Sequence, residues 1–115
     1  MGALHYGGTS LEFEDRLLSH LQIVVVQKFR RGESFLMSWL QGDAQTMTRR
    51  SLWMTPGTVV FFHFNGSRTP AIDEDWLKRL AASAESSMGL VVASADGKPV
   101  HLPVSRPARA RLYAS

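Results

Sequence analysis

The chain has 115 residues, of which 44% are hydrophobic and 20% are charged, and this length fits one small domain. It contains no cysteine, which excludes thiol catalysis, cysteine-ligated zinc and iron–sulfur centres and fits a reducing compartment. No apolar run approaches the roughly 20 residues of a membrane span, and the N-terminus lacks the pattern of a signal peptide. We therefore expect a cytoplasmic protein with no membrane partner.

The excess positive charge is concentrated at the C-terminus. The formal net charge is +3, yet residues 1–93 carry nine basic and nine acidic side chains, whereas residues 94–115 carry four basic and one acidic. The second stretch also has three prolines and few large apolar side chains, so its burial cannot offset the entropy of ordering. We predict a single α+β domain over 1–93 and a basic, flexible tail over 94–115. The arginines of the tail either keep the chain soluble or make weak phosphate contacts.

The first third of the domain is predicted to form a strand pair and a helix. Residues 3–6 and 11–14 flank a glycine turn, which is typical of a short hairpin. Residues 15–31 repeat apolar side chains at helical spacing, and Gly32 supplies a stop. The β-branched run at 23–26 favours a strand locally, but the longer helical pattern outweighs it.

The middle third is predicted to form three strands. Residues 33–40 alternate between two faces, and residues 49–54 return after a polar loop, which gives a hairpin. Its first strand places Phe35, Met37 and Trp39 on one face and Leu36, Ser38 and Leu40 on the other. Residues 59–64 are apolar on both faces, which predicts a central strand.

The last third is predicted to form a second helix and a final strand. Asp73 can cap a helix over 73–87, and Ile72 can pack onto Leu77. Gly89 can end this helix before a strand at 90–93. The order β-β-α-β-β-β-α-β predicts an α+β fold, with an antiparallel or mixed sheet of about five to six strands and two helices on one face.

No constellation of catalytic or metal-binding residues stands out in the sequence. The histidines at 5, 20, 63 and 101 lack the spacing of metal ligands, so we expect no metal, no cofactor and no catalytic residues. His63 is expected to be a hydrogen-bonded core residue. Lys28 falls within the apolar arc of the first helix, where its stem can lie on the core while its ammonium reaches the last carbonyls. A reactive buried lysine is the alternative.

Basic side chains form two candidate partner-binding sets. On the first helix, Arg16, His20 and Arg31 share a polar face, which is either simply solvated or a stripe that binds a partner. The second set is a basic–aromatic surface of the kind that stacks single-stranded bases, and it combines the pairs Arg30–Arg31 and Arg49–Arg50 with Trp53. The alternative is that Trp53 packs in the core. Arg68 follows Gly66 and Ser67, where it can hold an anion.

Four blocks of the sequence carry a family resemblance: residues 4–7 (LHYG), 13–22 (FEDRLLSHLQ), 28–35 (KFRRGESF) and 66–72 (GSRTPAI). Over residues 2–92 the chain resembles a family of small actinobacterial proteins of unknown function that often bear the label "ATP-dependent DNA ligase". The resemblance implies a DNA-related role. A ligase holds AMP on the lysine of a Lys-x-Asp-Gly motif, and none of the three lysines of this chain lies in one.

Three functions follow from the sequence as hypotheses. The leading one is a non-catalytic module that binds a protein or a nucleic acid through exposed loops and basic side chains. The second is an enzyme of nucleotide chemistry that uses Lys28 or Arg68. The third is a structural homo-oligomer closed by an apolar sheet face or edge.

Overall fold

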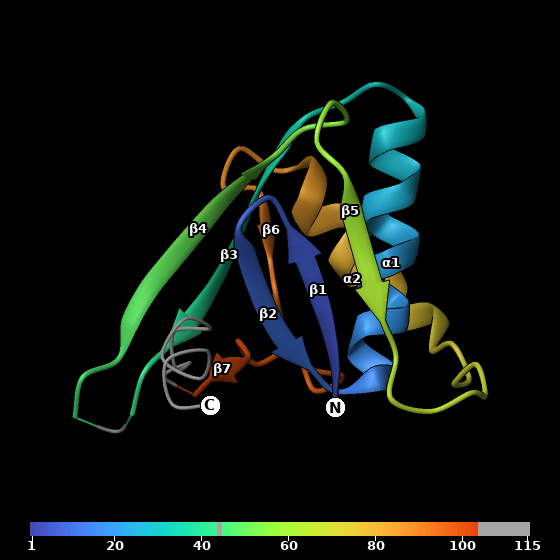
Figure 1. The fold of residues 1–115 in the computed structure, drawn as a ribbon. Coiled ribbons are helices and arrows are strands. Elements are labelled where there is room, and N and C mark those ends of the chain that lie inside the picture. The colour runs from blue at the N-terminus through green and yellow to red at the C-terminus, as the bar shows by residue number, and fades with distance from the viewer. Residues whose placement is uncertain (44, 104–115) are drawn as a thin grey trace, which may run out of the picture.

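The computed structural model describes residues 1–43 and 45–103, which form two helices and seven strands in two sheets. Figure 1 shows the first sheet in front of the two helices, and the hairpin β3–β4 extending from the body as a long arm. The α+β class is confirmed, and the order of the elements is close to the predicted one. The structure adds a division of the strands between two sheets.

The front sheet, sheet A, is antiparallel and has the order β2-β1-β5. Its strands are β1 (Gly2–Tyr6), β2 (Thr9–Phe13) and β5 (Val60–His63). Alternation along β1 and β2 turns Leu4, Tyr6, Leu11 and Phe13 into the core. The prediction of a central strand at 59–64 is wrong, because β5 lies at an edge of sheet A and Val59 is 83% exposed.

The second sheet, sheet B, is mixed. The strands β3 (Phe35–Gln41) and β4 (Thr48–Met54) form an antiparallel hairpin, and β6 (Leu90–Val91) and β7 (His101–Leu102) both pair with β3 in parallel. The strand β7 lies within the stretch that the sequence assigns to the tail, and Leu102 is buried. Of the predicted tail, residues 94–103 are described, whereas 104–115 lie outside the described residues.

The helices α1 (Asp15–Arg30) and α2 (Glu74–Glu85) pack on each other behind sheet A. The apolar face of α1 is buried as its spacing predicts. The predicted cap of α2 is present, since the Asp73 carboxylate accepts hydrogen bonds from the backbone N–H groups of Asp75 and Trp76. The core thus lies between the two sheets and the helix pair.

Candidate functional site

The face of sheet B that points away from the core is the site of interest, and we call it the outer face of sheet B. Because side chains alternate along a strand, burial of the odd-numbered apolar residues of β3 turns its even-numbered ones outward. The antiparallel register then places the odd-numbered residues of β4 beside them. The outer face comprises Leu36, Ser38 and Leu40 of β3 and Arg49, Ser51 and Trp53 of β4.

A pocket of about 390 Å³ opens on this face, a volume within the usual range of small ligand sites. The hydroxyls of Ser38 and Ser51 hydrogen-bond to each other at 2.9 Å and place a polar pair among apolar neighbours. Met88, from the turn before β6, lies at the rim. The lining residues are Leu36, Ser38, Trp39, Leu40, Arg49, Ser51, Ser87, Met88, Val91 and Pro99.

Trp53 is the most unusual residue of the outer face, because 60% of this large aromatic side chain is exposed. The alternative that placed it in the core is therefore wrong. Its position in the strand is the reason: the next residue, Met54, takes the inward position and is fully buried, so Trp53 must point outward. In the register it lies opposite Leu36, four residues along β4 from Arg49.

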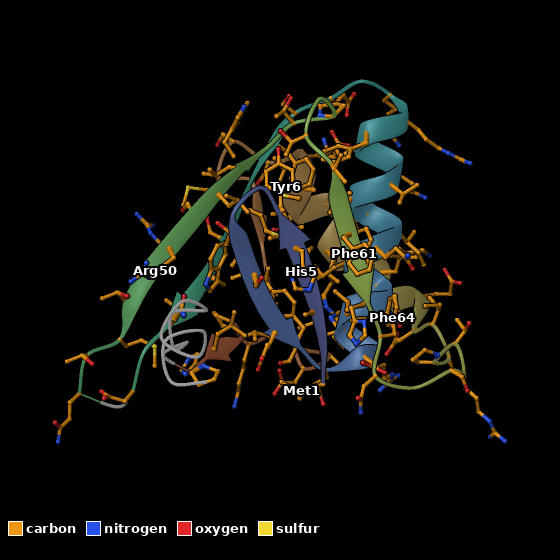
Figure 2. All side chains as sticks on the ribbon, viewed as in Figure 1. Met1, His5, Tyr6, Arg50, Phe61 and Phe64 are labelled. Carbon is orange, nitrogen blue, oxygen red and sulfur yellow. The ribbon has the colours of Figure 1, made fainter. Side chains whose placement is uncertain are left out.

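The strands of the hairpin β3–β4 carry two positive charges and no negative charge. The two strands contain Arg49 and Arg50 and no carboxylate, and neither arginine forms an ion pair within the described residues. Arg50 shares the inward side with Leu52 and Met54 but is exposed, since the arm extends beyond the core (Figure 2). In the connecting loop, hydrogen bonds from Thr46 and Gln45 to Asp43 hold the pKa of that carboxyl below its usual value.

The basic stripe predicted on α1 is not assembled as a free surface. The guanidinium of exposed Arg16 lies over the Trp76 ring, 5.4 Å from its centroid. His20 was expected on a polar face, but it is completely buried and stacks on Trp76 with ring centroids 4.3 Å apart. Its Nε2 accepts the Asp73 N–H at 2.9 Å, so its Nδ1 carries the proton and donates it to the Arg16 carbonyl at 2.7 Å. His20 therefore joins the two helices.

An ion-pair network lies at the C-terminal end of α1. Lys28 is buried, and its Nζ lies 3.2 Å from a carboxylate oxygen of Glu33 and 3.2 Å from one of Glu85. The ammonium thus reaches two carboxylates and not the helix carbonyls that the sequence suggested. Arg31 lies 3.1 Å from the same Glu85 oxygen. Arg30 is exposed and has no ion pair with any residue that the structure describes.

The backbone of the loop between β5 and α2 binds the carboxylate of Asp15, the first residue of α1. The backbone N–H groups of Asn65 and Gly66 donate to the two carboxylate oxygens of Asp15 at 3.1 and 2.9 Å. These bonds lower the pKa of Asp15, and the bond from Gly66 has the larger effect. Two amides of this loop are therefore unavailable to an external anion, and Arg68 is exposed.

The structure thus brings together only part of the predicted set. Arg49, Arg50 and Trp53 belong to one arm, whereas Arg16, Arg30, Arg31 and Arg68 lie on other elements. Sequence reasoning missed the pocket, whose signal was the row of Leu36, Ser38 and Leu40 on one face of β3. His63 was expected in the core but is exposed on β5. Within 1–43 and 45–103, no three His, Asp or Glu side chains are grouped to hold a metal ion.

Comparison with known proteins gives a family and no function. No curated protein and no solved structure matches the chain. None of the described helices is long and apolar enough to cross a membrane. The family model described as "Domain of unknown function (DUF7882)" matches residues 1–95, which is most of the chain. The chain therefore belongs to this family of domains of unknown function.

Proposed function

We propose that this chain is a non-catalytic module that binds single-stranded nucleic acid on the outer face of sheet B. The observation that carries the proposal is the exposed indole of Trp53 on the same face as the unpaired guanidinium of Arg49. Nucleobases stack on exposed aromatic rings in proteins that bind single strands, and arginines neutralise the phosphates. The DNA-related role implied by the family resemblance supports the same class of partner.

The charge of the arm favours an anionic partner over a neutral one. Neither strand of the hairpin carries a carboxylate that would repel phosphates. Arg49 is the arginine of the outer face, and one phosphate contact on a single strand gives weak binding with a slope of log K against log salt of about −0.7. Arginines of the region 104–115 would add to this slope without adding to base stacking.

A titration of a labelled oligothymidine by fluorescence anisotropy tests this proposal. We expect Trp53→Ala to weaken binding about 5- to 150-fold, because one stacked base contributes about 1–3 kcal/mol. Arg49→Gln should weaken binding and reduce the salt slope by about 0.7. The controls are Val26→Ala, which removes an exposed apolar side chain from α1, and Arg30→Gln, which removes an unpaired arginine from the same helix. Both controls should bind like the unmodified chain.

The outcome decides between the arm, the tail and other partners. One further variant changes Arg106, Arg109 and Arg111 of the full chain to Gln. If this variant loses binding while Trp53→Ala retains it, the proposed site is wrong. Equal affinity of all variants, or no binding at low salt, also contradicts it and directs attention to a protein partner.

The competing nucleotide chemistry has less support. Lys28 would have to act as a free amine, but its ammonium is enclosed by Glu33 and Glu85. Retention of label from ATP on the denatured chain, and its loss in Lys28→Met, would contradict the non-catalytic part of the proposal.

A further inference from the structure

The strand β5 has a free edge and carries no Lys, Arg, Asp or Glu. Among the described residues β5 pairs only with β1, so its second side has no strand beside it. Val59 is 83% exposed and Phe61 is 57% exposed. Figure 2 shows Phe61 next to His5 on the front of sheet A, and their ring centroids lie 5.7 Å apart.

Edge strands of proteins that stay monomeric are usually protected by charges or proline, because an exposed edge pairs with other strands. The edge strand β2 carries Glu12, and the edge strand β4 carries Arg49 and Arg50. Residues 57–64, in contrast, contain no Lys, Arg, Asp or Glu. This uncharged apolar segment is of the kind that aggregates when it stays uncovered.

We infer that β5 pairs with β5 of a second copy of this chain, which joins two copies of sheet A into one continuous antiparallel sheet. The absence of charge identifies a second copy as the occupant. In a two-fold symmetric contact each strand meets itself, so Glu12 of β2 or Arg49 of β4 would meet a like charge. The uncharged strands β6 and β7 at the fourth edge have only two residues each, so β5 is the longest described edge strand that meets its own copy without repulsion.

The alternation of side chains limits how the two strands pair. If the solvent-facing sides of the two copies of sheet A lie on the same side of the joined sheet, each odd-numbered residue of β5 must pair with an odd-numbered residue. Phe61 then lies opposite either Phe61 or His63 of the second copy, and its exposed ring is covered from the side. The half-buried Val60 and Phe62 extend the core across the contact.

The test measures the mass of the full chain by light scattering over a wide range of concentration. The unmodified chain should be a dimer that dissociates on dilution, and Phe61→Lys should be a monomer at every concentration. Met88→Lys is the matched control, because Met88 is 62% exposed and lies on the turn before β6, away from β5. This control should dimerise like the unmodified chain.

Three results would overturn the inference: a monomeric unmodified chain at the highest concentration, a dimer that survives Phe61→Lys, or species that grow without limit. If Phe61→Lys does not fold by circular dichroism, Val59→Lys replaces it. Val59 lies just outside the strand that pairs with β1, so the change spares the fold, and it faces His63 of the second copy when Phe61 meets Phe61. The inference is independent of nucleic-acid binding, because Trp53→Ala should leave the dimer intact.

Discussion

His20 shows how a polar side chain can belong to the core. Both of its ring nitrogens have partners, so its complete burial leaves no polar atom unsatisfied. One of these partners is the backbone of Asp73, the residue that caps α2. The imidazole therefore fixes the start of α2 against the first turns of α1.

Replacement of His20 by Phe should keep the stacking on Trp76 and remove both hydrogen bonds. We expect the free energy of unfolding to fall by about 1–3 kcal/mol, because the Asp73 N–H is then buried without an acceptor. Urea denaturation measures this change. His101→Phe, at an exposed histidine, should change the stability by less than about 0.5 kcal/mol. Equal effects of the two variants would contradict the role assigned to His20.

Asp15 makes stability depend on pH. Its pKa in the folded chain is below the ordinary value of 3.8, so its carboxylate stabilises the fold above pH 3.8, and this stabilisation is lost as the pH falls through the lowered pKa. Asp15→Asn should therefore be less stable than the unmodified chain at neutral pH, with a difference that shrinks in acid. Denaturation midpoints across the pH range measure this, and a difference independent of pH would contradict it.

At the scale of elements, Gly89 connects α2 to β6 in a conformation that few other residues accept. Its φ is 78°, and a Cβ would lie 2.4 Å from the Leu36 carbonyl oxygen. We expect Gly89→Ala to cost more than about 2 kcal/mol of stability, because the clash adds to the strain of the left-handed region. Gly97 has a φ of 85° with no atom near the position of a Cβ. Gly97→Ala should cost only about 1–2 kcal/mol, and equal losses would show that the clash is relieved.

The sequence predicts elements well where a periodic pattern is long. The helix α1 and its buried face follow from 16 residues of regular spacing, and the cap of α2 follows from Asp73. The position of β5 in its sheet cannot be predicted in this way, because a short run that is apolar on both faces fits a central strand and an uncovered edge strand equally well. The strand β7 escapes prediction because two residues carry no pattern, and its pairing with β3 is set by contacts distant in sequence.

The sequence predicts only part of the candidate site. Arg49, Arg50 and Trp53 lie within one short strand, so their proximity follows from the sequence. Which face Trp53 occupies depends on the register against β3 and on the core beneath it, and neither is visible in six residues. The pocket needs Val91 and Met88 beside β3, a neighbourhood that only the parallel pairing of β6 creates.

At the scale of the whole molecule, the two proposals use opposite parts of one fold. The arm β3–β4 carries Arg49, Arg50 and Trp53, while the uncharged edge of sheet A is free to meet a second copy. A dimer built in this way would carry two arms. Its apparent affinity for a long single strand would then exceed that for a short one, since the second arm binds at an effective concentration set by the first.

The most direct measurement of the central claim is the tryptophan fluorescence of the chain during titration with oligothymidine. Trp39 and Trp76 are buried, so a stacked base would reach only Trp53 and quench its emission. We predict a saturable quench in the unmodified chain and its loss in Trp53→Phe, which keeps a ring for stacking and therefore still binds by anisotropy. An unchanged emission during binding, or an equal quench in Trp53→Phe, would contradict the assignment of the outer face of sheet B as the nucleic-acid site.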